Sequence, residues 1–287
     1  MKTDFPNITI LGGGLLGGSL ALALAALENP PHIRLWARRE ETAEAAAKLG
    51  IANVTSDLAE AVRDASMIIL AVPVGSMEAL VTAALEAGVP DGCLVTDVGS
   101  VKRVPHRKIA PLLKGRDIRF IGSHPMAGSE RNGLSAVTAT LFQNAACLLT
   151  NDNGAPAGQT AALERFWKQI GCRTSWMSAA IHDELVARIS HLPHIIAASA
   201  ARVCLKDPSE GKFGGGGLRD TTRVAAGNPT MWAEIVIENR EALTDLLRES
   251  IDDLREILAS LENANQEQAR QWLVTAKQRR DPLNSYQ

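Results

Sequence analysis

The sequence contains few aromatic residues and few cysteines, and it has no excess of charge of either sign. Aromatic residues make up 4% of the 287 residues, and only one of them is tyrosine. The cysteines lie 25 to 54 positions apart without a CxxC pair: Cys93, Cys147, Cys172 and Cys204. This spacing matches neither a disulfide framework nor a zinc ribbon, and it is typical of a protein in a reducing compartment.

The charge balance and the apolar runs exclude further classes of protein. The 30 basic and 32 acidic residues leave a net charge of −2, so there is no basic surface of the kind that binds nucleic acid. No apolar run approaches the roughly 20 residues needed to cross a bilayer. The first residues, MKTDFPNITILG, lack the basic and apolar regions of a signal peptide. We therefore expect a cytoplasmic protein that binds neither membrane nor nucleic acid.

The first 177 residues alternate short apolar runs with helical patterns. Such alternation predicts an α/β domain with a parallel sheet, right-handed crossovers and helices on both faces. The run at 67–72, closed by a proline, is typical of a strand buried on both faces. The predicted strands are 8–11, 33–36, 67–72, 93–96, 118–121, 145–150 and 172–176, and the predicted helices are 15–27, 40–49, 76–87, 102–113 and 160–170.

Strand patterns stop after residue 177, so residues 178–287 are predicted to form a second, all-helical domain. Residues 179–204 read as one long helix, bent where Pro193 cannot donate a backbone hydrogen bond. Asn228 and Pro229 begin another helix of roughly 30 residues with one apolar stripe. A helix that long needs a partner surface, either inside the domain or in a second subunit of a homodimer.

A glycine-rich turn follows the first predicted strand. Residues 12–17, GGGLLG, have the spacing G-x-G-x-x-G between a strand and a helix, which favours a dinucleotide site over a merely tight turn. In such a site Gly12 permits the turn, Gly14 lets the backbone approach the pyrophosphate, and Gly17 lets the helix and strand pack closely. The free N–H groups at the start of the helix then face the anion.

The end of the second strand distinguishes the two nicotinamide cofactors. NAD is usually bound by an acidic side chain about twenty residues beyond the last motif glycine. Arg38 and Arg39 stand there instead, 21 and 22 positions after Gly17, and two guanidinium groups suit the 2′-phosphate of NADP. Alternatively, the two arginines only begin a solvent-exposed helix and bind no phosphate. In that case NAD is the alternative cofactor.

Three further segments contain residues suited to catalysis. The predicted strands at 93–96 and 118–121 are followed by DVGSVK and by GSHPMAGSE, at the sheet edge where open α/β folds bind ligands. His124 suits proton transfer near neutral pH, and Ser100 suits holding that histidine or a substrate hydroxyl. In the third segment, Arg219 and Arg223 lie one helical turn apart and suit a carboxylate substrate, although a surface salt bridge is the alternative.

Two other segments that contain histidine admit simpler interpretations. His191 and His194 provide two metal ligands at most, and no third or fourth ligand accompanies them at zinc-like spacing, so we expect no metal. His182 and Asp183 are interpreted as the start of the long helix.

Together these segments resemble one enzyme family. GGGLLGGS, DVGSVK, FIGSHPMAGSE, ISHLPH and GGGLRDTTRVAAGNPTMW closely resemble the prephenate/arogenate (cyclohexadienyl) dehydrogenases of tyrosine biosynthesis. The resemblance extends from about residue 8 to residue 261. It implies an N-terminal Rossmann doubly wound sheet followed by an all-α domain that forms a homodimer. It also implies oxidative decarboxylation of prephenate to 4-hydroxyphenylpyruvate, or of arogenate to tyrosine, with NAD or NADP as hydride acceptor.

The resemblance assigns roles to individual residues. His124 matches the catalytic histidine that polarises or deprotonates the ring hydroxyl, and Ser100 matches the serine that hydrogen-bonds there. The expected substrate-binding residues are Arg223, which grips a carboxylate, and His194, Glu130, Trp232 and Gly216. The expected cofactor-binding residues are Gly12, Gly14, Leu15, Leu16, Gly17, Arg38, Arg39, Val72, Pro73 and Asp97.

Two other functions stay open at this stage. One is a different hydroxyacid dehydrogenase of similar build, which is expected to use a lysine of the helical domain as its acid or base. The other is a dinucleotide-binding sensor without catalysis, which the presence of a candidate base, serine and arginine disfavours. The sequence decides neither between prephenate and arogenate nor on tyrosine inhibition, which we expect at or near the active site if it occurs.

Overall fold

The computed structural model describes residues 4–127 and 133–286, which form two compact units. The first unit runs to Arg240 and the second from Glu241 onward. The predicted domain boundary between residues 177 and 178 falls inside the first unit and stays a prediction. Among the described residues, no helix has both the length and the apolar character needed to span a bilayer.

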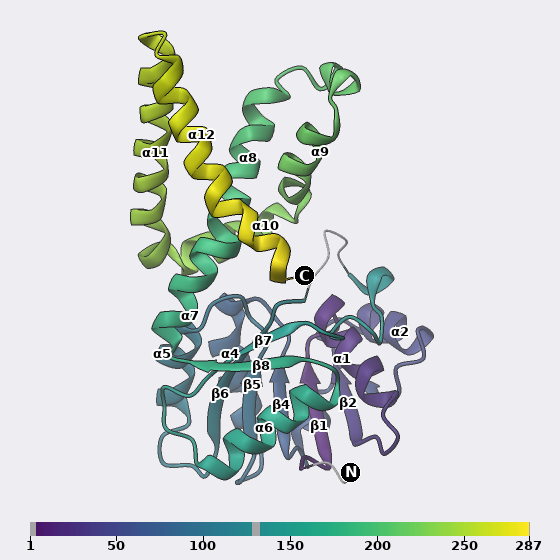
Figure 1. Cartoon of the computed structure of the whole chain (residues 1–287). Coiled ribbons are helices and arrows are strands. Elements are labelled where there is room, and N and C mark those ends of the chain that lie inside the picture. Colours follow the sequence, from purple (N-terminus) through teal and green to yellow (C-terminus); the bar gives the residue numbers. More distant parts are fainter. Residues whose placement is uncertain (1–3, 128–132, 287) are drawn as a thin grey trace. The chain divides into compact units, whose positions relative to one another are not determined.

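An eight-stranded sheet forms the centre of the first unit (Figure 1). Its spatial order is β3-β2-β1-β4-β5-β6-β7-β8, so the first six strands have the order of a doubly wound dinucleotide-binding sheet. The strands are β1 Asn7–Leu11, β2 His32–Trp36, β3 Val54–Thr55, β4 Met67–Leu70, β5 Leu94–Asp97, β6 Arg119–Pro125, β7 Ala146–Thr150 and β8 Arg173–Met177.

The last two strands correct the expectation of an all-parallel sheet. Strand β7 pairs antiparallel with β6, with His124 opposite Leu148, while β8 is parallel to β7. A parallel neighbour requires a crossover connection, usually a helix. The described residues between β6 and β7 contain only a short 3-10 turn, Leu134–Ala136, whereas a full helix connects β7 to β8.

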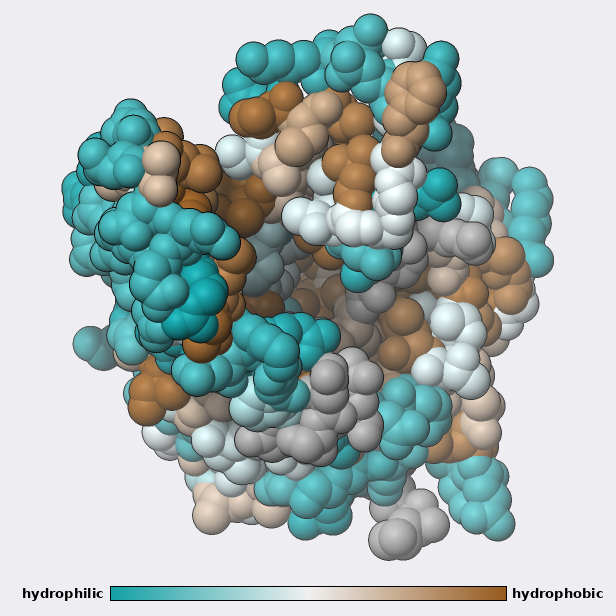
Figure 2. All heavy atoms as spheres, turned by 45° about the horizontal axis from the view of Figure 1, so that its top comes forward, coloured by the Kyte–Doolittle hydropathy of each residue, from teal (hydrophilic) through white to brown (hydrophobic). Residues whose placement is uncertain are grey.

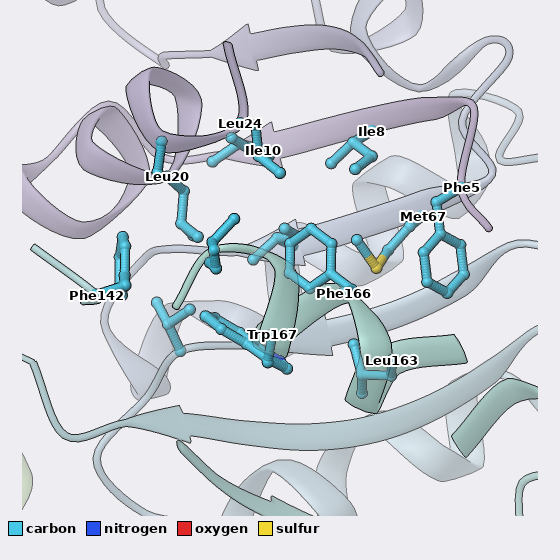
Figure 3. Packing of buried hydrophobic residues seen from close by; sticks show 14 of the residues in the cluster. Phe5, Ile8, Ile10, Leu20, Leu24, Met67, Phe142, Leu163, Phe166 and Trp167 are labelled. Atoms are coloured by element: carbon cyan, nitrogen blue, oxygen red, sulfur yellow. The ribbon is translucent and has the colours of Figure 1, made fainter. Parts of the chain in front are cut away.

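Helices cover both faces of the sheet, as the alternating pattern predicts. One face packs against α1 (Leu15–Ala25), α2 (Glu40–Lys48) and α6 (Ala157–Gln169). Figure 3 shows Leu20, Phe166 and Trp167 of this layer beside Ile8 and Ile10 of β1. The other face packs against α3 (Leu58–Val62), α4 (Val74–Glu86) and α5 (Arg103–Leu112).

Described residues beyond β8 form helices only, which confirms the helical second part. The elements are α7 Ala179–Val186, a π-helical segment Ala187–His191, α8 Leu192–Cys204, the 3-10 segment Pro208–Phe213, α9 Gly216–Thr222, the 3-10 segment Arg223–Ala226, α10 Pro229–Glu238, α11 Arg240–Glu262, α12 Gln266–Arg280 and the 3-10 segment Asp281–Tyr286.

Regular α-helical geometry is interrupted at two points in these helices. The helical run 179–204 widens into a π-helix directly before Pro193, where the missing proline N–H leaves a carbonyl without its usual donor. The single helix predicted from Pro229 is wrong, because it divides at Asn239. That residue leaves helical geometry, and its buried side chain hydrogen-bonds to α7 and to the π-helical segment instead.

Candidate active site

The glycine turn between β1 and α1 packs closely against neighbouring backbone. Gly12 has φ +130°, and a Cβ atom there would lie 2.3 Å from the carbonyl oxygen of Ala71. A Cβ atom on Gly17 would lie 1.9 Å from the carbonyl oxygen of Gly12. Both positions therefore exclude a side chain.

The face of this turn at Gly14 is open. No atom lies within 4 Å of the position that a Gly14 Cβ would occupy, and no side chain caps the N-terminus of α1. Gly14, Leu15 and Leu16 line a cavity, and Val72 and Pro73, which follow β4, line it as well. An open glycine backbone and uncapped helix N–H groups fit the pyrophosphate of a dinucleotide.

Arg38 and Arg39 lie where β2 ends, directly before α2. Both are exposed, and their side chains form no hydrogen bond or ion pair with the described residues. Two unengaged guanidinium groups in place of an acidic side chain are compatible with a phosphate ligand.

The cavity beside the glycine turn has a volume of about 340 Å³. It lies within the first unit and is lined by the ends of β4, β5 and β6 and by the π-helical segment and α10. The predicted residues His124, Ser100 and Trp232 line it together with the start of α1. The structure thus brings the candidate base next to the candidate dinucleotide site.

His124 is held by a chain of hydrogen bonds that the sequence did not reveal. Its Nδ1 lies 2.9 Å from Nε2 of His182, and Nδ1 of His182 lies 2.8 Å from Oδ1 of Asp183. Asp183 also accepts from the backbone N–H groups of Lys102 and Arg103, at 2.7 and 3.0 Å. The His182 ring and two backbone N–H groups therefore surround one buried carboxylate, which is 1% exposed, and His124 is linked to it through His182.

The hydrogen bonds determine which ring nitrogen carries the proton. A carboxylate only accepts, so Nδ1 of His182 donates to Asp183, and Nε2 of His182 accepts from Nδ1–H of His124. Nε2 of His124 is then unprotonated. It has no hydrogen-bond partner among the described residues, and His124 lines the cavity. This is the tautomer that a general base requires.

Burial and neighbouring groups keep these histidines neutral. Burial lowers the pKa of His124 well below 6.5, and His182, Lys102 and His191 lower it further. Burial also lowers the pKa of His182, against the opposing effect of its bond to Asp183. Burial alone would raise the pKa of Asp183, but hydrogen bonds from His182, Arg103 and Lys102 lower it on balance.

A buried ion pair supports the strand ends beneath the cavity. Nζ of Lys102 contacts Oδ2 of Asp97 at 2.5 Å and the carbonyl oxygens of Gly99 and Val101, and both charged side chains are completely buried. Asp97 also accepts from the backbone N–H of Ser123, next to His124. Asp97 does not line the cavity, so its predicted contact with a cofactor stays a prediction.

The predicted substrate-binding residues are brought together only in part. His194 stacks on Trp232, with ring centroids 3.5 Å apart and an interplanar angle of 9°, but only Trp232 lines the cavity. Arg223 and Gly216 are exposed and lie outside its lining. Glu130 lies outside the described residues. Ser100 lines the cavity, but no hydrogen bond joins it to His124.

Sequence reasoning missed four polar residues at this site besides His182 and Asp183. His191 lines the cavity, and the amide nitrogen of Asn239 lies 2.9 Å from its Nδ1. Glu234 and Glu238 also line it, and Oε1 of Glu234 accepts from the backbone N–H of Gly75 at 2.6 Å. The four-residue spacing of the two glutamates could have indicated that they lie on the same face of α10. Nothing in the local sequence indicates the pairing of His191 with Asn239.

The fold and the glycine turn together define the class of protein, a dinucleotide-dependent dehydrogenase, in which His124 is the candidate base. Comparison with known proteins gives the family. Residues 20–176 match the family described as "Prephenate dehydrogenase, nucleotide-binding domain", and residues 178–275 match "Prephenate dehydrogenase, dimerization domain". The chain therefore belongs to the prephenate dehydrogenase family.

Three relatives illustrate the match. The chain is 36% identical to a cyclohexadienyl dehydrogenase of Zymomonas mobilis, over 90% of this chain and 89% of that protein. It is 33% identical to a prephenate dehydrogenase of Bacillus subtilis, over 96% and 76% of the two chains. It is similar to the crystal structure of Aquifex aeolicus prephenate dehydrogenase in complex with hydroxyphenyl propionate and NAD⁺, with a TM-score of 0.89, 26% identity and 99% and 100% coverage.

Proposed function

We propose that the chain catalyses the oxidative decarboxylation of prephenate or arogenate in tyrosine biosynthesis, with His124 as the general base. The observation that carries this proposal is the unprotonated Nε2 of His124, which has no partner among the described residues and lies at the wall of a cavity that the glycine turn also lines. The similarity to prephenate and cyclohexadienyl dehydrogenases supports the substrate class.

The residues of this chain supply the proton chemistry. When bound, the oxidised nicotinamide accepts a hydride from the ring carbon that carries the hydroxyl. Nε2 of His124 accepts the hydroxyl proton as that hydride leaves, and Asp183 stabilises the resulting charge through His182. His124 returns the proton to the phenolate oxygen once CO₂ has departed and the ring is aromatic. No net proton is consumed, and Ser100 orients the hydroxyl toward His124.

Several further residues are assigned by proposal. Gly12, Gly14, Leu15, Leu16, Gly17, Val72 and Pro73 form the dinucleotide site. Arg223, His194, Trp232, Gly216 and Glu130 contribute to substrate binding. Tyrosine, which is the product formed from arogenate, would inhibit by binding at the same site.

The decisive experiment measures initial rates on prephenate and on arogenate, each with NAD and with NADP, for the wild type and for His124→Asn. We expect turnover that falls about 10²- to 10⁴-fold in the variant, the range for loss of a general base. Because burial and nearby groups lower the pKa of His124, the acid limb of the wild-type kcat profile should lie below pH 6.5. Absence of turnover in all four combinations would contradict the proposed activity.

We further propose that NADP is the preferred cofactor, since Arg38 and Arg39 are exposed and unengaged at the end of β2. Changing both to alanine should lower kcat/KM for NADP about 10-fold or more, because a hydrogen bond to a charged group contributes about 1.5–3 kcal/mol. The kcat/KM for NAD should change little. Lys48→Ala, at the far end of α2, is the control. An equal loss for both cofactors would contradict the assignment to the 2′-phosphate.

The assembly and the location are also proposals beyond the family match. We infer a homodimer formed through the helical part, which is supported by the match to a dimerization domain. All four cysteines are unpaired, which supports a location in the reducing cytoplasm.

A further inference from the structure

A second histidine, His191, stands in the wall of the same cavity. It is the last residue of the π-helical segment, is 1% exposed, and meets the edge of Trp232 with ring centroids 6.1 Å apart. It lines the cavity together with His124. The mechanism above does not use it.

The proton on His191 is placed by Asn239. The amide nitrogen of Asn239 donates to the carbonyl oxygen of Asp183 and approaches Nδ1 of His191, both at 2.9 Å. A carbonyl oxygen only accepts, which fixes the orientation of the Asn239 amide. Nδ1 of His191 is therefore the acceptor, and the ring proton resides on Nε2.

The remaining N–H of His191 has no acceptor in the part of the chain that the structure describes. Nε2 makes no hydrogen bond with any described residue. It is also not one of the fully buried nitrogen or oxygen atoms that lack a partner, so this atom is accessible. Burial lowers the pKa of His191 to about 4, so the ring is neutral in the physiological range. His191 is thus a neutral donor, whereas His124 is an acceptor.

The cavity needs such a donor. Among its described lining residues there is no lysine or arginine, and the two charged side chains are the carboxylates of Glu234 and Glu238. Prephenate and arogenate each carry two carboxylates. A neutral N–H provides a hydrogen bond to such an oxygen while leaving the proton affinity of the nearby His124 less disturbed than a cation would.

We propose that His191 binds the substrate by donating Nε2–H to one of its carboxylate oxygens, and that Asn239 is the positioning residue that keeps this tautomer. The inference rests on the proposed function, since it takes the substrate class from it.

The first test compares His191→Leu with His191→Gln. Leucine removes the donor, whereas the terminal amide of glutamine can place an N–H near the position of Nε2. We expect KM for the preferred substrate to rise about 10- to 150-fold in the leucine variant, the range for a hydrogen bond to a charged group, and to recover largely in the glutamine variant. The acid limb of the kcat profile should move only slightly upward, because His191 is the smallest of the causes that lower the pKa of His124.

The second test reads the tautomer without relying on activity. In ¹⁵N-histidine-labelled protein, His191 should show a protonated Nε2 and an unprotonated Nδ1, with the His191→Gln spectrum used for assignment. Asn239→Asp replaces the amide donor by an acceptor and should move the ring proton to Nδ1. Asn263→Asp, at the exposed end of α11, controls for the added charge.

The Asn239→Asp variant should also make binding depend on pH. Substrate affinity should be regained only at acid pH, where the imidazolium carries a proton on both nitrogens. The other titratable groups around His191 are Asp183, His182 and His194, with His124, Glu234 and Glu238 in the cavity wall, and all of these are the same in the variant and the wild type.

The outcomes separate the two proposals. An active wild type whose leucine variant keeps its KM, or a spectrum with the proton on Nδ1, would overturn the role of His191 and leave the proposed function intact. A wild type inactive on both substrates would overturn the proposed function, whatever the tautomer. A raised KM that glutamine restores, together with a protonated Nε2, supports the inference.

Discussion

The properties of His124 depend on residues far from it in the sequence. His182 lies 58 positions away, and Asp183 reaches it only because α7 packs where the turn before α5 presents the N–H groups of Lys102 and Arg103. The hydrogen bonds from these N–H groups keep Asp183 ionised in a buried position. The tautomer of the candidate base is thus set by the packing of a helix against a loop.

Asp183→Asn tests this dependence. The asparagine amide can donate where the carboxylate accepted, which would reverse the tautomer of His182 and place a proton on Nε2 of His124. We expect kcat to fall about 10²- to 10⁴-fold, since the comparable change of aspartate to asparagine in a serine protease triad lowers kcat by about 10⁴. Steady-state rates and the pH profile of kcat measure this effect.

The neighbouring residue provides the matched control. Glu184 is exposed and pairs with Arg103 at the surface, so Glu184→Gln should leave kcat within about twofold of the wild type. If Asp183→Asn kept wild-type rates with an intact fold, the hydrogen-bond chain would have no role in catalysis.

The site was predictable where a residue has a local sequence context and unpredictable where it depends on a long-range partner. His124, Ser100 and the glycine turn follow strand ends, and the structure places all of them at one cavity. His182 was interpreted as part of a helix start, and it is indeed in the first turn of α7. Its bond to His124 could not be predicted, because no periodicity indicates which residues of two distant elements meet.

At the level of elements, the glycine turn couples packing to ligand binding. The carbonyl of Gly12 fills the space beside Gly17, so the first turn of α1 lies directly against the end of β1. This close approach keeps the helix N-terminus at the sheet edge, where its N–H groups face the cavity.

Gly17→Ala should therefore reduce both stability and dinucleotide affinity. The added Cβ would lie 1.9 Å from a backbone oxygen, which cannot move without shifting α1. We expect a loss of about 1–3 kcal/mol in the free energy of unfolding, the usual cost of overpacking, together with weaker cofactor binding. Chemical denaturation and a dinucleotide titration measure the two effects.

Gly158→Ala is the control for this change. Gly158 lies in the first turn of α6, is exposed and has open space around its Cβ position, so alanine should be neutral or slightly stabilising. Equal stability of the two variants would show that α1 can shift without cost.

Strong periodic patterns predicted most helices and strands, whereas very short elements and the point at which a predicted helix divides were missed. The strands of the first part and their helices agree with the structure to within a few residues at each end. The two-residue β3 and the five-residue α3 were missed because they are too short to show a pattern. The division at Asn239 was missed because the apolar spacing continues across it, while its cause is the pair of hydrogen bonds to Asp183 and His191. The direction of β7 depends on the absence of a crossover helix, which spacing alone does not reveal.

For the whole molecule, the second unit presents an apolar helix face. On α11, four large apolar side chains at helical spacing are 42–68% exposed, which would be costly if they stayed in water: Ile251, Leu254, Leu258 and Leu261. Figure 2 shows hydrophobic residues, in brown, reaching the surface among hydrophilic ones. Because the match to a dimerization domain covers this helix, we infer that the face is covered by a second subunit.

Replacing Leu254 and Leu258 by lysine should shift the dimer toward the monomer. Fully burying a leucine contributes about 1.5–3 kcal/mol, and a two-fold interface would lose both leucines from each subunit. Sedimentation should then report about 30.6 kDa rather than twice that mass at micromolar concentration. Asp245→Lys introduces charge on the same helix at an exposed residue paired with Arg248, and this control should remain dimeric. If the double variant also stayed dimeric, the subunits would meet through another face, and the apolar side chains of α11 would have to be covered within the chain itself.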